Sequence, residues 1–300
     1  MLIGVDIGGG SAKIGVVAEN RIIERRSLPT GAEISADEML GKIADECLAL
    51  VKKYQIMRVG VGSPGYVDMA AGVVTYAVNL RLSGVPVAGI LEKRLGLPVT
   101  LANDANCAAV GEFYAGSGIG AGNLIFVTLG TGIGGGIILG GKLYTGSDGR
   151  AGEIGHICVE VDGEDCGCGR RGCWERYASA SGLVRMAEAA AAENPESELA
   201  RLVKRGASGR TVFEALRAGC PVGSAVFDRY MDYLATGIFG LENIFSPDKI
   251  IIGGGISAAG DELLLPLREK LGVGDTLQLS ALGNDAGLIG AALMYRQFEM

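Results

Sequence analysis

Asp6-Ile7-Gly8-Gly9-Gly10-Ser11 lies between two apolar segments, Leu2–Asp6 and Ala12–Ala18. This arrangement predicts a strand, a glycine turn and a second strand, with a third strand at Arg21–Arg26. Backbone N–H groups in such a turn can surround an anion, and Asp6 could hold Mg²⁺ beside it. A tight hairpin whose glycines supply positive φ is an equally good interpretation of the turn alone.

The same order of elements returns in the second half of the chain. It consists of a strand, a glycine turn and two further strands, at Leu124–Leu129, Gly130–Gly136, Ile137–Leu139 and Lys142–Tyr144. This weak internal repeat predicts two related α/β lobes that each present a glycine hairpin. Gly130, Gly132 and Gly135 match G-x-G-x-x-G, but a strand follows where a dinucleotide-binding turn requires a helix. A phosphate-binding hairpin remains, and Gly253–Gly255 forms a third glycine run.

The other elements follow from apolar spacing. Strands are predicted at Arg58–Val61, Leu97–Leu101 and Lys249–Ile252, and helices from a Ser35/Glu38 capping box to about Val51, from Asp104 to about Tyr114, and at Ser181–Glu193, Ser224–Asn243 and about Ala286–Arg296. We therefore expect an N-terminal lobe over residues 1–115 and a larger lobe over residues 116–285. The last helix, within residues 286–300, is expected to pack back on the first lobe.

Composition narrows the function. The 300 residues are 48% hydrophobic and 20% charged, so the chain can bury a core and is not disordered. A net charge of −7 argues against a general affinity for nucleic acid or an anionic membrane. Tyr114–Gly141 carries no charge, yet eleven of its residues are glycine, which favours buried strands over a membrane span. The opening MLIGVDIGGG has no basic start, so we expect no targeting segment.

Two short motifs carry chemistry. Asn103-Asp104 stands between a strand and a helix, where Asp104 is either the helix N-cap or a general base. Glu153-Ile154-Gly155-His156 is followed by Cys166-x-Cys168-x4-Cys173, and these residues include the only histidine of the chain. Cys₃His is a regular structural zinc set. The alternatives are free thiols, a disulfide, or Cys158 as the fourth ligand.

The remaining thiols and the tryptophan are expected to be structural. Cys47, Cys107 and Cys220 are predicted core residues, and Trp174 is predicted to pack. Seven cysteines without a secretion signal are typical of a cytoplasmic protein.

Together these motifs resemble the ROK family of sugar kinases and repressors, in the actin-like ATPase superfamily. The resemblance covers essentially the whole chain and rests on Asp6-Ile7-Gly8-Gly9, Gly62-Ser63-Pro64-Gly65, Asn103-Asp104-Ala105, Leu129–Gly134, Glu153–His156, Cys166–Glu175, Ile252–Ser257 and Leu282–Gly287. It implies an α/β, two-lobed actin-like ATPase (ribonuclease H-like) fold with a cleft between the lobes. It also implies an ATP-dependent sugar kinase that uses Mg²⁺ and carries a structural Zn²⁺.

The resemblance assigns roles to individual residues. Asp104 matches the catalytic base. The residues that match sugar contacts are Gly65, Asn103, Asp104, Glu153, His156 and Glu175; those that match zinc ligands are His156, Cys166, Cys168 and Cys173; and those expected around ATP are Asp6, Gly8, Gly9, Gly10, Ser11, Gly130, Thr131, Gly132, Gly254 and Gly255. The family usually has Thr where this chain has Gly10, so the hydroxyl facing the phosphates is lost or comes from Ser11.

Glucose is the first candidate for the implied substrate, N-acetylmannosamine or N-acetylglucosamine the second, and fructose the third. A non-catalytic sugar sensor and a polyphosphate donor are the alternatives. Family repressors carry a DNA-binding domain before the first strand, which here starts at residue 2, so we expect no nucleic-acid partner and no membrane partner. A cytoplasmic homodimer or higher homo-oligomer is expected.

Overall fold

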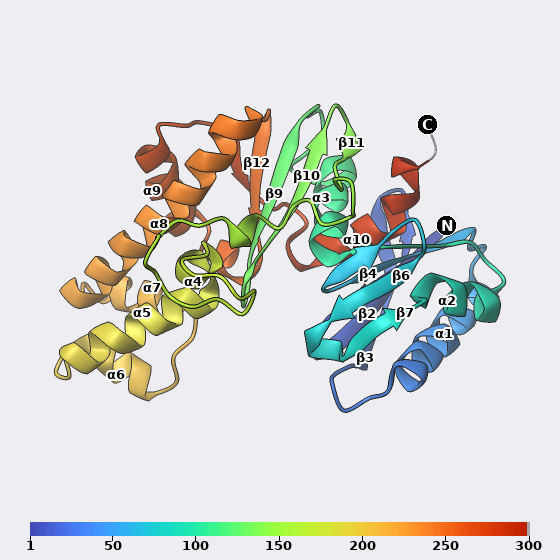
Figure 1. Ribbon diagram of the computed structural model, residues 1–300, viewed down its shortest axis with the longest axis horizontal. Coiled ribbons are helices and arrows are strands. Elements are labelled where there is room, and N and C mark those ends of the chain that lie inside the picture. Colours follow the sequence, from blue (N-terminus) through green and yellow to red (C-terminus); the bar gives the residue numbers. More distant parts are fainter. Residues whose placement is uncertain (299–300) are drawn as a thin grey trace. The chain divides into compact units, whose positions relative to one another are not determined.

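The protein is described by a computed structural model over residues 1–298 (Figure 1). These residues form two compact units. Unit 1 comprises residues 1–126, 136–152 and those from 280 onward, and unit 2 comprises residues 127–135 and 153–279. The chain therefore passes between the units four times, after residues 126, 135, 152 and 279. The sequence predicted boundaries near residues 115 and 286.

Unit 1 is built on a five-stranded sheet. Its strands, in spatial order β3-β2-β1-β4-β8, are Arg21–Pro29, Ser11–Ala18, Leu2–Ile7, Arg58–Ser63 and Val99–Asn103. β1, β2 and β3 form the predicted antiparallel hairpin and third strand, while β4 and β8 run parallel to β1. A small antiparallel sheet that the sequence did not predict consists of β5 (Tyr66–Asp68), β6 (Val73–Ala77) and β7 (Leu82–Val85).

Helices cover both faces of this sheet. On one face, α1 (Ala36–Lys53) and α2 (Val87–Leu95) share a buried apolar cluster with the sheet, and the Glu38 amide donates to the Ser35 hydroxyl at 3.2 Å, as the capping box predicted. On the other face, α3 (Asp104–Ala115) and α10 (Ala286–Leu293) share a second cluster. Burial raises the pKa of Cys47 on α1 to about 12, in keeping with its predicted place in the core.

Glycines let α10 lie directly on its neighbours. A Cβ added at Gly4 of β1 would lie 2.1 Å from the Leu288 carbonyl oxygen, and one at Gly60 of β4 would lie 1.7 Å from that of Ala291. A Cβ at Gly290 would likewise lie 1.6 Å from the Cys107 carbonyl oxygen on α3. Because any side chain at these positions would overlap backbone atoms, α10 is held at a fixed distance from the sheet and from α3.

A second five-stranded sheet has the order β11-β10-β9-β12-β13. These strands are Lys142–Leu143, Ile133–Leu139, Leu124–Leu129, Lys249–Gly253 and Leu277–Leu279. Strand, glycine turn, strand and strand recur here as the repeat predicted. The helices of unit 2 are α4 (Glu175–Ala178), α5 (Ala180–Glu193), α6 (Glu198–Lys204), α7 (Thr211–Arg217), α8 (Pro221–Phe245) and α9 (Asp261–Leu271). Short 3₁₀ turns lie at η1 (Val78–Leu80), η2 (Ile154–His156), η3 (Gly255–Ala259), η4 (Gly283–Asp285) and η5 (Met294–Gln297).

Trp174 is packed inside unit 2, in keeping with its predicted packing role. The side chain is fully buried, its indole N–H donates to the Tyr233 carbonyl oxygen at 2.8 Å, and a Cβ at Gly237 of α8 would lie 2.0 Å from the ring. The residue next to Cys173 is therefore anchored against the longest helix. No helix within residues 1–298 has both the length and the apolar character needed to cross a membrane.

Candidate active site

In unit 1, candidate residues gather where three parallel strands end. Register pairs Asp6 of β1 with Gly62 of β4, and Ser63 of β4 with Asn103 of β8. The carboxyl ends of adjacent parallel strands form one edge, which is where open α/β sheets bind ligands. Asp6 and Asp104 also both raise the pKa of the buried Cys107 thiol, after the larger effect of its burial.

Asn103 caps α3 and connects two strand ends. Its Oδ1 accepts hydrogen bonds from the amides of Ala105 (2.9 Å) and Asn106 (3.2 Å), while its Nδ2 donates to the Gly65 carbonyl oxygen at 3.1 Å. Asp104 is the first residue of the helix, and its Oδ1 accepts from the Ala105 amide at 2.9 Å. The interpretation of Asp104 as the cap is therefore wrong. Its carboxylate instead lies at the positive end of α3, which stabilises negative charge.

Position 65 requires glycine for two reasons. Its φ is +84°, and a Cβ would lie 2.1 Å from the Tyr76 carbonyl oxygen. The turn after β4 is thus pressed against β6, and its carbonyl oxygen is held toward the Asn103 side chain.

The first glycine turn is held in place by Thr30, a residue that belongs to no motif. The Thr30 hydroxyl donates to the Gly8 carbonyl oxygen at 2.6 Å, and its amide donates to that of Gly10 at 3.2 Å. The glycines with positive φ among residues 1–298 do not include Gly8, Gly9 or Gly10, so the positive-φ explanation of this turn is wrong. Asn79 of η1 lies close by, its Cβ 3.5 Å from the position of a Cβ at Gly9.

Asp6 is a largely buried carboxylate behind this turn. Burial raises its pKa, and Lys13, whose Nζ lies 3.6 Å from Asp6 Oδ2, partly opposes that rise. A Cβ at Gly287, in the first turn of α10, would lie 3.3 Å from the carboxyl carbon of Asp6. The predicted magnesium-binding carboxylate is therefore positioned jointly by β2 and α10.

In unit 2, the predicted zinc ligands lie together. One donor atom from each of His156, Cys166, Cys168 and Cys173 falls within a group whose members are all within 4.8 Å of one another. Cys166 Sγ lies 3.7 Å from His156 Nδ1, and Cys168 Sγ lies 3.5 Å from Cys173 Sγ. Tetrahedral zinc would separate such ligand atoms by about 3.5–3.8 Å, so the donor set fits this ion. Burial raises the pKa of Cys166 to about 12, so zinc binding would displace its proton.

These four residues form the one group within residues 1–298 whose side chains could hold a metal ion, and Cys158 lies outside it. All seven cysteines are free, as expected for thiols rather than a disulfide.

Two carboxylates flank the histidine. Glu153 Oε2 lies 3.8 Å from His156 Nε2, and Glu175 Oε1 lies 3.6 Å from His156 Nδ1. The Cys166 thiol also donates to Glu175 Oε1 at 3.2 Å. Gly155 keeps this turn against β10, because a Cβ there would lie 2.2 Å from the Ile133 carbonyl oxygen. Carboxylates held in this way can accept hydrogen bonds from neighbouring hydroxyl groups of a ligand.

The second glycine turn lies beside the same carboxylate. The Ala180 amide at the start of α5 donates to the Gly130 carbonyl oxygen at 2.9 Å, and Thr131 is exposed. A Cβ at Gly132 would lie 2.5 Å from Glu175 Oε2. Gly254, with φ +84°, packs against the backbone of Leu129 just before the turn, where a Cβ would lie 2.5 Å from the carbonyl oxygen.

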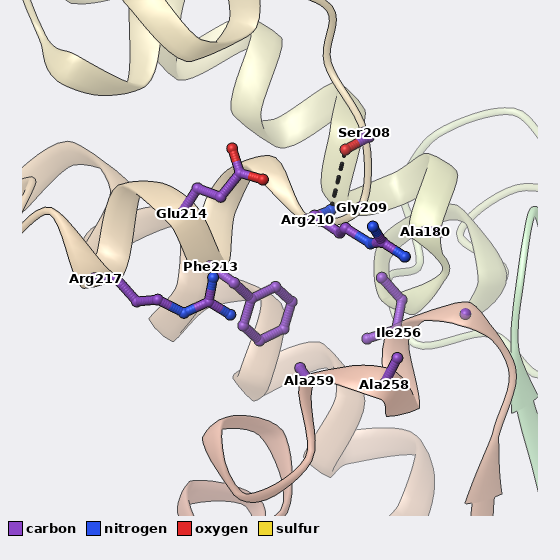
Figure 2. A pocket seen from close by; sticks show the side chains of 11 residues that line it. Ala180, Ser208, Gly209, Arg210, Phe213, Glu214, Arg217, Ile256, Ala258 and Ala259 are labelled. Atoms are coloured by element: carbon purple, nitrogen blue, oxygen red, sulfur yellow. Dashed lines mark hydrogen bonds between the residues drawn. The ribbon is translucent and has the colours of Figure 1, made fainter. Parts of the chain in front are cut away.

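A cavity of about 470 Å³ opens next to Gly255 (Figure 2). Its lining comes from the start of α5, the loop before α7, α7 itself and η3, and comprises Ala180, Ser208, Gly209, Arg210, Phe213, Glu214, Arg217, Gly255, Ile256, Ala258 and Ala259. The Phe213 ring lies between the side chains of Arg210 and Arg217, facing Ala259 (Figure 2). Arg217 is paired with Glu262 at 2.8 Å, whereas within residues 1–298 no hydrogen bond or ion pair engages the Arg210 guanidinium.

Sequence reasoning selected only Gly255 from this lining. The other lining residues come from the start of α5, a short loop without a motif, α7 and η3, so no single pattern indicated them. A cavity lined by Phe213 and Ile256 beside the Arg210 guanidinium can take an aromatic ring, because such rings stack on apolar and cationic groups.

The chain is similar to known protein families and structures. The ROK family model matches residues 2–298. A glucokinase of Halalkalibacterium halodurans is 38% identical, over 99% of this chain and 95% of that protein, and one of Streptomyces coelicolor is 39% identical, over 99% and 98%. The crystal structure of a ROK family glucokinase from Streptomyces griseus in complex with glucose and AMPPNP has a TM-score of 0.83 and 39% identity, over 99% of both chains. This likeness confirms the predicted two-lobed α/β fold of the actin-like ATPase type.

Proposed function

Because the chain belongs to the ROK family, we propose that it is an ATP-dependent glucokinase. It transfers the γ-phosphate of ATP to glucose and releases glucose 6-phosphate and ADP. The observation that supports this proposal most directly is the Asn103–Asp104 pair at the end of β8, with Asp104 at the N-terminus of α3.

Asp104 is the general base. The sugar hydroxyl oxygen forms a bond to the γ-phosphorus, the bond from that phosphorus to the bridging oxygen of ADP breaks, and the hydroxyl proton passes to the Asp104 carboxylate. The helix N-terminus supports this role because it stabilises the ionised form that accepts the proton. A positioned base of this kind contributes about 10²–10⁴ to the rate.

The remaining sugar contacts are Gly65 and Asn103 in unit 1 and Glu153, His156 and Glu175 in unit 2. The Asn103–Gly65 hydrogen bond supports a rigid contact on the first side. The two carboxylates beside His156 are acceptors suited to neighbouring hydroxyl groups, which favours an unmodified hexose. N-acetylmannosamine, N-acetylglucosamine and fructose are the alternative substrates.

The nucleotide phosphates bind at the two glycine turns, around Gly8–Ser11 and Gly130–Gly132. Gly254 and Gly255 line the adenosine side, and the apolar cavity beside Gly255 takes the base, with Arg210 as its cationic neighbour. Asp6 holds the Mg²⁺ that accompanies ATP. The main support for this last role is the burial of Asp6, which keeps a carboxylate ready for a cation behind the first turn.

Zinc bound by His156, Cys166, Cys168 and Cys173 has a structural role. When bound, it fixes the loop that carries Glu153 and Glu175 and supplies no step of the phosphoryl transfer. The protein acts in the cytoplasm as a homodimer or higher homo-oligomer, and its free thiols agree with that compartment.

The test is ADP release measured over a panel of glucose, N-acetylmannosamine, N-acetylglucosamine and fructose, each with ATP. We expect glucose to give the highest kcat/KM, and Asp104→Asn to lower kcat by about 10²–10⁴ while glucose still binds by calorimetry. Glucose binding without ADP release from any sugar would instead identify a non-catalytic sensor. Replacing ATP by polyphosphate in the same assay tests the alternative donor.

A further inference from the structure

The Glu175 carboxylate occupies a space enclosed on two sides. On one side its Oε1 lies 3.2 Å from Cys166 Sγ and 3.6 Å from His156 Nδ1. On the other side is Gly132, where a Cβ would lie 2.5 Å from Oε2. The side chain is only 23% exposed, so it has little room to move without losing one of these neighbours.

The backbone does not explain why residue 132 is glycine. Gly132 is not among the residues with positive φ in the described part of the chain. The heavy atom that an added Cβ would approach most closely belongs to the Glu175 side chain, and the next is the carboxyl carbon of the same residue at 3.6 Å. Glycine at this position is therefore matched to the carboxylate rather than to the conformation of the turn.

We propose that Gly132 is a positioning residue for the sugar, acting through Glu175. This inference rests on the proposed function, in which the turn around Gly132 binds nucleotide phosphates and Glu175 binds sugar hydroxyls. The absence of a side chain at Gly132 then sets the orientation of the sugar-binding carboxylate. A change in the nucleotide turn consequently alters recognition of the sugar.

The test is Gly132→Ala. The atom that the new methyl group meets is the end of a flexible side chain, so the fold can accept the substitution while the carboxylate moves. We expect KM and the calorimetric Kd for glucose to rise about tenfold, as for the loss of a hydrogen bond to a charged group. The glucose Kd is measured without nucleotide, so that any effect of the methyl group on phosphate binding by the same turn does not enter it.

Gly130→Ala is the matched control from the same turn. The nearest atom to a Cβ at Gly130 is 4.0 Å away, so Glu175 is undisturbed and the Kd for glucose should stay at the wild-type value, whatever happens to ATP. A second comparison uses Glu175→Asp, whose shorter side chain withdraws the carboxylate from residue 132. In that background, adding Gly132→Ala should weaken glucose binding by less than about twofold.

Two results would overturn the inference. One is an unchanged glucose Kd in Gly132→Ala. The other is a loss of glucose affinity on Gly132→Ala that is equally large in the wild-type protein and in the Glu175→Asp background. A wild-type protein that binds glucose but releases no ADP would contradict the proposed function alone, because the calorimetric comparison still decides the role of Gly132. A wild-type protein that binds none of the sugars in the panel would contradict both.

Discussion

The side-chain amide of Asn103 donates to the Gly65 carbonyl oxygen at 3.1 Å, while its side-chain oxygen caps α3. One residue thus joins the ends of β4 and β8 and starts the helix that carries Asp104. Asn103→Asp separates these tasks, because a carboxylate keeps the capping acceptor and loses the donor. We expect glucose KM to rise about tenfold, with an unfolding free energy within about 0.5 kcal/mol of wild type.

Asn103→Ala is the comparison for this variant, since it removes both functions. Its unfolding free energy should fall by about 1 kcal/mol in urea titrations. Equal destabilisation of the two variants would contradict the division of roles.

The open space around Gly10 predicts that a larger side chain there can improve the binding of ATP. A Cβ there would meet no heavy atom within 4 Å beyond its chain neighbours, and Gly10 is not among the described residues with positive φ. Gly10→Thr should therefore fold and place a hydroxyl at the nucleotide turn, lowering the KM for ATP by about three- to tenfold. Gly10→Val has the same shape without the hydroxyl, and an equal gain in that variant would exclude the hydroxyl as the cause.

The cysteine cluster predicts one zinc ion per chain. Cys168→Ser should abolish bound zinc in elemental analysis and lower the melting temperature by about 5–10 °C. The KM for glucose should rise as well, because the loop that carries Glu175 is no longer fixed by the zinc ion. Cys158→Ser is the matched control in the same loop, since Cys158 stands outside the ligand group of the described chain. Equal zinc contents in the two variants would contradict the ligand assignment.

The contact between Trp174 and α8 predicts opposite effects for two glycines of that helix. Gly237→Ala would overlap the buried ring and should destabilise the protein by about 1–3 kcal/mol. A Cβ at Gly240 has open space, so Gly240→Ala should stabilise by up to about 1 kcal/mol through helix propensity. Thermal unfolding of the two variants checks the sign, and a loss of stability in both would contradict this packing.

The burial of Asp6 predicts a pH-dependent cost in stability. Its folded-state pKa is raised above the ordinary 3.8, so the folded protein binds the proton more tightly than the unfolded chain. The contribution of this proton to folding stability is fully present below the ordinary pKa of 3.8 and is lost as pH rises through the folded-state pKa. Asp6→Asn should consequently gain stability relative to wild type as pH rises above about 4, until Asp6 is ionised in the folded protein as well, while kcat falls. A stability difference that does not grow with pH would contradict this account.

Several features were predictable because local physics determines them. The apolar segments on both sides of Gly8–Ser11 and Gly130–Gly136 predicted both hairpins, and the Ser35/Glu38 pair predicted the start of α1. The spacing of Cys166, Cys168 and Cys173 predicted a cluster that the structure brings together with His156.

Other features depend on contacts that no local pattern encodes. The small β5–β7 sheet consists of strands of three to five residues, too short for a clear alternation. The lining of the cavity beside Gly255 is assembled from three segments that lie far apart in the sequence. The contact of Gly132 with Glu175 joins residues more than forty positions apart, and the sequence shows only another glycine in a glycine-rich turn.

The abundance of glycine is often read as a sign of a pliable chain. In this protein glycine has the opposite effect. The backbone of α10 packs directly on Gly4 and Gly60, and Gly290 packs on the backbone of α3, with no side chain between them. The result is a stiff platform beneath Asp6 and the first turn, and its tolerance of mutation should be lowest at residues that carry no functional group at all.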